Sequence, residues 1–238
     1  MFTGMMKTFC LTGALLACAI GTSGSAERPA ASDVWKIKIG APINAIPNSF
    51  AEFACGSNGG PPAQPLSGFA DFMRCPPEPS GLREVYFRYD DELEYWAKAN
   101  NIPLLIASSG TKVYDLPVIA SVLIDEAGIV RGLRLASDPR DTSVRREEAR
   151  FLHPFLLARF EKRDGDSWKC TDLPAEKGET PVNGEFLKQD CTLRSDGIEY
   201  ILKVRYLRRE GQRQIDPHTG RFTTGQFTSH VYFEMHQL

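Results

Sequence analysis

The sequence predicts an α+β protein with an antiparallel β-hairpin, a C-terminal three-strand antiparallel meander and one main helix, stapled by two disulfides. Several short segments alternate apolar and polar residues, one segment has helical spacing, and four cysteines follow a leader-like N-terminus. The chain has 238 residues, of which 42% are hydrophobic and 24% are charged. This is ordinary globular usage, which excludes a disordered, collagen-like or multi-pass membrane chain.

Residues 1–26 have the parts of a secretory signal. Lys7 is the one charged side chain, an apolar run covers 9–20, and small residues lead to Ala26. We expect cleavage near Ala26 and a periplasmic or secreted mature chain that begins at Glu27. The apolar run is short for a membrane span, so we expect no transmembrane span in the mature chain.

A second interpretation of the leader stays open. The segment Leu15-Leu16-Ala17-Cys18 resembles the lipobox of bacterial lipoproteins, in which the cysteine becomes the lipidated first residue. This interpretation predicts a lipid-anchored chain that begins at Cys18.

Removal of the leader leaves Cys55, Cys75, Cys170 and Cys191. An even number of cysteines in an exported chain predicts two disulfides. We favour Cys55–Cys75 and Cys170–Cys191, because each pair brackets a stretch rich in proline and glycine. The alternative is a four-thiolate zinc site, which would lack the usual C-x-x-C pairs.

The N-terminal part predicts short elements around a long loop. Alternation predicts strands over 35–39 and 84–89, and a short helix interrupted by Pro47 fits 43–53. Glycines and prolines predict a loop over 55–79. Asp91 and Glu94 are spaced as a capping box, which predicts a helix over 92–100. The apolar run 104–107 predicts a buried strand.

The clearest element is a hairpin, with strands over 113–125 and 129–136 around a turn at 126–128. A helix over 143–160 follows, with a kink or a fresh start at Pro154. Alternation then predicts strands over 185–194, 198–209 and 226–237. We divide the chain into the signal 1–26, an α+β part 27–142 and a helix-plus-sheet part 143–238. The last two parts are also compatible with one continuous domain.

The last predicted strand suggests a metal site. If Val231, Phe233 and Met235 face the core, then the opposite face of the strand is shared by His230, Tyr232, Glu234 and His236. Imidazole and carboxylate groups suit zinc, copper or iron, so His230, Glu234 and His236 are candidate ligands of a metal-dependent enzyme. The alternative is the ordinary polar face of a half-solvated sheet.

Lys203 and Arg205 lie on the corresponding face of the middle strand and are candidate binding residues for an anionic ligand. The formal net charge is −2, from 28 Lys plus Arg and 30 Asp plus Glu. This balance favours no nucleic-acid partner. The sequence identifies no cofactor and no catalytic set. It predicts an exported bacterial envelope protein with a binding or accessory role towards a protein or small ligand, with a metal-dependent periplasmic enzyme and a lipid-anchored assembly factor as alternatives.

Overall fold

The computed structural model describes residues 34–46, 50–57, 63–89, 92–102, 110–139, 147–161, 165–215, 222–224 and 227–238. All of them lie in one compact unit, Ala31–Leu238. The predicted signal, the lipobox at Cys18 and the strand predicted at 104–107 lie outside the described residues. In the described part of the chain, no helix is long and apolar enough to cross a membrane.

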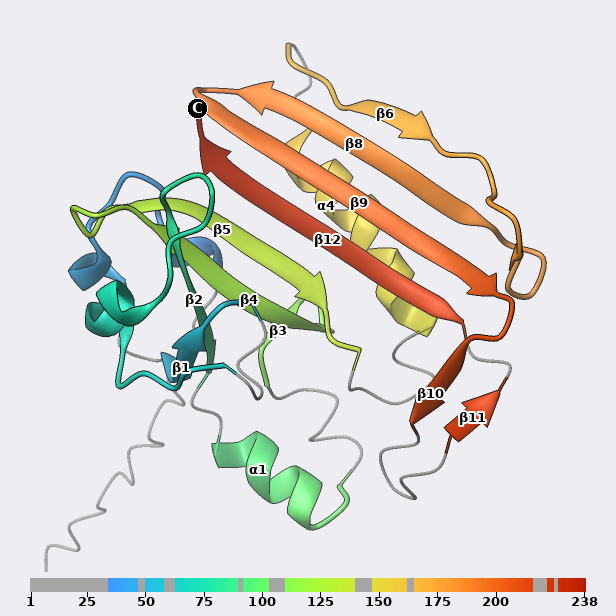
Figure 1. The fold of residues 1–238 in the computed structure, drawn as a ribbon, viewed down its shortest axis with the longest axis horizontal. Helices are drawn as coiled ribbons and strands as arrows, with labels where there is room; N and C mark the ends of the chain where they lie inside the picture. Colours follow the sequence, from blue (N-terminus) through green and yellow to red (C-terminus); the bar gives the residue numbers. More distant parts are fainter. Residues whose placement is uncertain are drawn as a thin grey trace, which may run out of the picture. The chain divides into compact units, whose positions relative to one another are not determined.

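One large antiparallel sheet organises the described residues (Figure 1). Its strands follow the order β1-β2-β4-β5-β12-β9-β8-β6, with β3 paired to β4 and β7 paired to β9. The bounds are β1 Phe50–Cys55, β2 Arg83–Tyr89, β3 Lys112–Val113, β4 Leu116–Ile124, β5 Val130–Ser137, β6 Lys169–Asp172, β7 Glu179–Thr180, β8 Leu187–Ser195, β9 Ile198–Arg209 and β12 Thr228–Gln237. A separate two-stranded pair is formed by β10 Arg213–Ile215 and β11 Phe222–Thr224.

The helices are short. In the described part of the chain, the α-helices are α1 Glu92–Ala99 and α4 Leu152–Phe160, and the 3-10 turns are η1 Val34–Lys36, η2 Ile43–Ala45, η3 Phe69–Arg74 and η4 Ala149–Phe151. Helix α4 begins two residues before Pro154, so this proline lies in the first turn of the helix. N–H groups of the first turn have no acceptor within the helix, so the N–H that proline lacks costs no helical hydrogen bond. The helix predicted over 143–160 is shorter than expected: α4 begins at Leu152, directly after the 3-10 turn η4, and residues 143–146 lie outside the described part of the chain.

The mostly antiparallel sheet, the main helix and the two disulfides confirm the predicted fold class in outline. Cys55–Cys75 and Cys170–Cys191 are the bonded pairs. Strands over 84–89 and 198–209, the helix over 92–100 and the hairpin of β4 and β5 also lie where they were predicted. The sheet passes from residues 27–142 into 143–238 without a break, because β5 pairs with β12.

The prediction of a strand over 35–39 is wrong, because the segment forms the 3-10 turn η1. Val34 and Ile37, three residues apart, are both buried there, and this spacing suits a 3-10 turn rather than a strand. Trp35 packs its ring 5.6 Å from Phe160 and 6.0 Å from Phe233. The segment therefore closes the end of the core between α4 and β12 instead of joining the sheet.

Two other local predictions need correction. The segment 43–53 forms η2 and then β1, because Phe50 and Ala54 enter the core as a strand rather than as a helical face. The loop between Cys55 and Pro79 contains the 3-10 turn η3, which buries Phe69 and Phe72 against that core.

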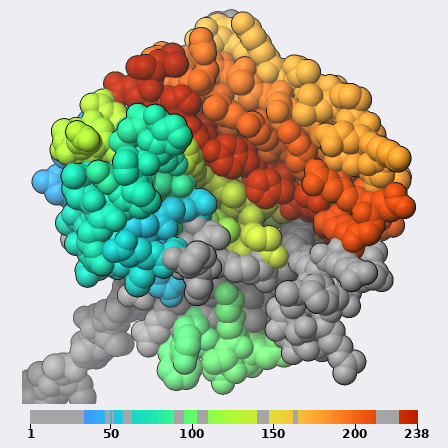
Figure 2. Space-filling view, in the orientation of Figure 1, coloured from blue at the N-terminus to red at the C-terminus, as the bar shows by residue number. Residues whose placement is uncertain are grey.

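The two faces of the sheet differ. Helix α4 covers one face, where Leu152, Leu156, Val231 and Phe233 join the apolar core and the rings of Phe160 and Phe233 stack at 5.1 Å. The other face carries polar side chains, and we call it the polar face. In Figure 1 α4 lies behind β9 and β12, and Figure 2 shows β12, β9 and β8 (red to orange) on the opposite surface, towards the viewer.

Candidate functional site

The register of the central strands assembles the polar face. Arg134 of β5 lies opposite Glu234 of β12, and Lys203 of β9 lies opposite Tyr232. Side chains two residues apart on a strand share a face, so charged groups from segments up to 100 residues apart meet there. This face is the candidate functional site, and it holds two ionic clusters.

The first cluster surrounds Arg134, and we call it the Arg134 cluster. Its guanidinium lies 2.6 Å from Glu234 Oε2 and 3.3 Å from Glu84 Oε2, and it also contacts both carboxylate oxygens of Glu78. Ser121 donates a hydrogen bond of 2.6 Å to Glu84. One cation therefore holds three carboxylates, with Glu78 supplied by the turn that follows Cys75.

The charged groups of the Arg134 cluster interact in a mostly buried site. The Arg134 side chain is 19% exposed and that of Glu234 is 10% exposed. Burial acts to raise the pKa of Glu234, but hydrogen bonds from Tyr232 and Arg134 outweigh it and lower that pKa. Burial acts to lower the pKa of Arg134, and hydrogen bonds to Glu78 and Glu234 raise it instead. Burial, followed by the bond to Glu234, raises the pKa of the Tyr232 hydroxyl.

His236 extends the Arg134 cluster towards β9. Its Nδ1 lies 2.9 Å from Glu234 Oε1 and its Nε2 lies 3.3 Å from Glu199 Oε2. Nδ1 is buried and has no hydrogen-bond partner among the described residues. Glu199 in turn accepts from Arg194 Nε at 2.7 Å. The contacts thus form one chain of charged and polar side chains from β2 to β8.

The structure brings together two of the three candidate metal ligands. Glu234 and His236 are in contact, but His230 lies opposite Arg205, at the other end of β12. Burial of part of the ring, and then the charge of Arg205, lower the pKa of His230. Within the described residues, no three His, Cys, Asp or Glu side chains are grouped so that they could hold a metal ion. Metal binding by this set stays a prediction.

The two candidate binding residues differ in their surroundings. Arg205 lies 2.6 Å from Asp190 and donates through Nη1 to the carbonyls of Gln189 and Val204. Lys203 is exposed, and its ammonium forms no ion pair with a described residue. Of these two residues, Lys203 is therefore the one whose N–H donors are available to a ligand.

The second cluster surrounds Lys188, whose side chain is only 5% exposed. Its Nζ lies 2.7 Å from Glu176 Oε1 and 2.9 Å from Glu179 Oε2. Hydrogen bonds to these two carboxylates raise the pKa of Lys188. A backbone hydrogen bond from Glu176, and then the bond from Lys188, lower the pKa of Glu179. A cation enclosed by two carboxylates is satisfied and fixes the 174–179 loop against β8.

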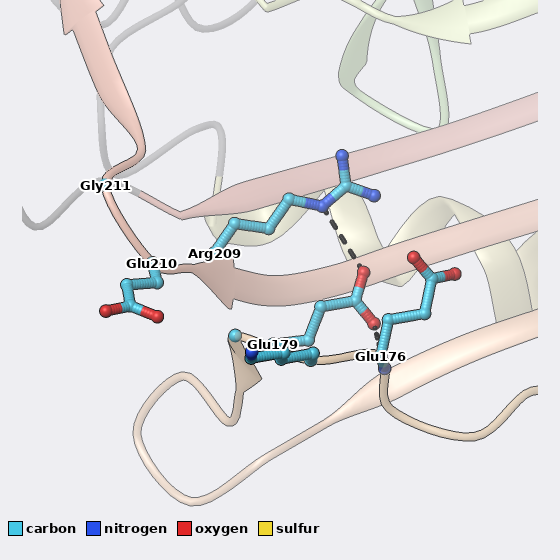
Figure 3. A pocket seen from close by; sticks show the side chains of 7 residues that line it. Glu176, Glu179, Arg209, Glu210 and Gly211 are labelled. Atoms are coloured by element: carbon cyan, nitrogen blue, oxygen red, sulfur yellow. Dashed lines mark hydrogen bonds and ion pairs between the residues drawn. The ribbon is translucent and has the colours of Figure 1, made fainter.

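A hollow of about 530 Å³ opens beside this second cluster (Figure 3). Its lining residues are Glu176, Lys177, Gly178, Glu179, Arg209, Glu210 and Gly211. In Figure 3 Arg209 reaches over β9 towards Glu179, to which its Nε donates at 3.3 Å, while Glu210 points the other way. Glu179 already accepts hydrogen bonds from Arg209, Lys188 and the backbone of Glu176. We therefore interpret the hollow as a surface depression lined by ion-paired side chains.

Several of these residues were not singled out from the sequence. Arg134 interrupts the apolar run of β5 between the buried Leu133 and Leu135, and that interruption is a usable signal for a paired charge. Lys188 has no comparable signal, because polar residues flank it. Its partners lie 9 and 12 residues away on a loop whose path follows no period.

Comparison of the chain with protein-family models, with curated proteins and with solved structures gives no match. The site therefore has to be interpreted from its own chemistry.

Proposed function

We propose that this protein is exported to the bacterial envelope and has a binding or accessory role there. The observation that carries the proposal is the pairing of all four cysteines that follow the predicted leader into two disulfides. Disulfides persist in oxidising compartments and are rare in the cytosol, where thiols are kept reduced. The leader-like composition of residues 1–26 supports the same compartment.

The polar face supports a binding role. Lys203 has an exposed ammonium opposite Tyr232. His230, two residues before Tyr232 on β12, is also exposed. The neighbouring Arg205 is held in place by Asp190, which makes this end of the face an ordered surface. We propose that Lys203 and His230 contact an anionic group of the ligand, a carboxylate or a phosphate, since an ammonium and an imidazole both donate hydrogen bonds to such groups.

The compartment is tested by intact-mass analysis of protein purified from its own envelope fraction under alkylating conditions. We expect a mature chain that begins at Glu27, with Cys55, Cys75, Cys170 and Cys191 all protected from alkylation. A lipid-modified Cys18 would replace this proposal with the lipid-anchored alternative. An uncut chain with reduced thiols in the cytosol would overturn both.

The binding surface is tested by NMR titration with inorganic phosphate and, separately, with succinate. We expect shifts confined to the backbone around Lys203 and His230, and their loss in Lys203→Glu. Lys38→Glu is the matched control, because Lys38 is also exposed but lies next to η1. Shifts that are absent from both titrations, or equal in both variants, would overturn the assignment of the anion contact.

A further inference from the structure

The two disulfides lie in different surroundings. Cys55 and Cys75 are 8% and 1% exposed, and both belong to the apolar core. Cys191 is fully buried, but its partner Cys170 is exposed. One bond is therefore enclosed by the core, and the other has one half at the surface.

Cys170 is exposed in the folded protein and lies on the edge strand of the sheet. Cys170 and Cys191 lie directly opposite each other on β6 and β8. Strand β6 is the last strand of the sheet, it pairs with β8 over four residues, and all four are exposed. Figure 1 shows β6 on the outer edge of the sheet. An external thiol can thus reach Cys170 from the open edge.

The buried half of this bond has polar neighbours. His153 of α4 is buried and places Nε2 3.9 Å from Cys191 Sγ. The Oε1 of Gln189 lies 3.2 Å from the same sulfur, and Gln189 Nε2 donates to Asp172 at 2.7 Å. Among the described residues, no titratable side chain contacts the sulfurs of Cys55 or Cys75. Within the described part of the chain, Cys170–Cys191 is thus the bond that has a titratable side chain beside it.

We propose that Cys170–Cys191 is a thiol-exchange site, opened and closed by a dithiol oxidoreductase of the compartment in which the protein resides. Cys55–Cys75 serves as a structural bond. The exchange site lies on the opposite side of the sheet from Lys203, so it adds to the binding role and does not depend on it.

The exchange balances as two successive displacements. A thiolate of the partner attacks Cys170 Sγ, which forms a mixed disulfide and breaks the bond to Cys191. The Cys191 sulfur leaves as a thiolate, accepts a hydrogen bond from His153, and takes a proton from it when the imidazole is charged. The second thiol of the partner then attacks the mixed disulfide, which oxidises the partner to a disulfide and releases Cys170 as a thiol. Two electrons pass from the partner dithiol to this protein.

Opening the bond has a structural consequence. Strand β6 is tied to β8 by this disulfide and by a ladder of four residue pairs. Without the disulfide, the short exposed ladder and the hydrogen bond from Gln189 to Asp172 still join β6 to β8, and their release uncovers the backbone edge of β8. We expect faster amide hydrogen exchange in β6 and β8 after reduction, with β4 and β5 unchanged.

The order of opening tests the proposal. The native protein is treated with limiting dithiothreitol, quenched by alkylation at timed intervals and mapped by mass spectrometry. We expect Cys170 and Cys191 to be alkylated at least about tenfold faster than Cys55 and Cys75, because Cys170 is an exposed residue whereas Cys55 and Cys75 are both buried. Equal rates, or faster opening of Cys55–Cys75, would overturn the proposal.

The role of His153 has its own readout. Burial lowers the pKa of His153 below its ordinary 6.5. We expect the opening rate, normalised to the thiolate concentration of the reagent, to rise as pH falls through that lowered pKa, because the charged imidazole protonates the leaving sulfur. We expect the variant His153→Gln to lose this rise in opening rate. The control variant His236→Gln, which changes a residue of the polar face, should keep it. A flat normalised profile in the wild-type protein would remove His153 from the mechanism even if His153→Gln failed to fold.

Discussion

Arg134 is the single residue on which the largest charge cluster of the polar face depends. It forms ion pairs with Glu78, Glu84 and Glu234 in a site where its own side chain is 19% exposed. Removing one partner of a buried ion pair leaves the others without compensation, and the penalty exceeds the net value of the intact pair. The cluster therefore makes Arg134 difficult to replace.

We predict that Arg134→Met lowers the free energy of unfolding by about 3 kcal/mol at neutral pH, because three carboxylates lose their counter-ion. Urea unfolding monitored by fluorescence measures the change. The penalty should shrink in acid, where the carboxylates are protonated. Arg131→Met is the matched control, since Arg131 pairs with Asp125 at a more exposed position and should cost less than about 1 kcal/mol. Equal losses in the two variants would contradict this prediction.

The lowered pKa of Glu234 predicts how the stability of the protein changes with pH. Its pKa in the folded protein lies below the ordinary 4.5, so the unfolded chain binds a proton more readily. The stabilisation is fully present above pH 4.5 and is lost as pH falls through the folded pKa. We predict that Glu234→Gln is less stable at neutral pH and loses less stability between about pH 5 and about pH 3 than the wild-type protein. Parallel stability curves from urea titrations across this range would refute it.

At the scale of elements, the contact between β5 and β12 joins the two halves of the sheet. Gly132 lies opposite His236 in this pair. A Cβ at Gly132 would come within 2.9 Å of Leu123 Cδ1 and of the Met235 carbonyl oxygen. The leucine end can move, but the backbone oxygen belongs to the ladder itself. The glycine is therefore required by the close approach of two strands.

We predict that Gly132→Ala lowers the free energy of unfolding by about 1 to 3 kcal/mol, the usual cost of overpacking. The same change at Gly68 meets no atom within 4 Å and needs no left-handed backbone, so it should cost less than about 0.5 kcal/mol. Thermal and urea unfolding of both variants measure the difference. If Gly132→Ala were as stable as Gly68→Ala, the strands would not approach as closely as described.

The elements that were predicted correctly are those with a clear period. The hairpin of β4 and β5 and the long strand β9 repeat apolar residues at every second position, which a strand alone satisfies. The segment at Trp35 has too few residues to separate a strand from a 3-10 turn. Its structure is decided by the rings of Phe160 and Phe233, which it meets only in the folded protein.

At the scale of the whole molecule, the disulfides restrict the unfolded chain more than they add contacts to the folded one. The bonded residues are 20 and 21 positions apart, so each closed loop contributes roughly 3 kcal/mol in the chain-entropy account. We predict that the double variant Cys55→Ser with Cys75→Ser lowers the free energy of unfolding by about this amount, measured by urea unfolding. The corresponding double variant at Cys170 and Cys191 should lose a similar amount, and an unchanged stability in either would contradict the account.

By itself, the sequence determined the local period of the strands and the pairing of the cysteines, because each depends on residues close together in the chain or on the loop they bracket. The tertiary structure alone decided that β5 lies beside β12 and therefore that Arg134 meets Glu234, 100 residues away. It also decided that His153 faces the buried sulfur of Cys191. These contacts depend on strand order and register, which are chosen by the burial of the whole core and leave no repeating pattern in the chain.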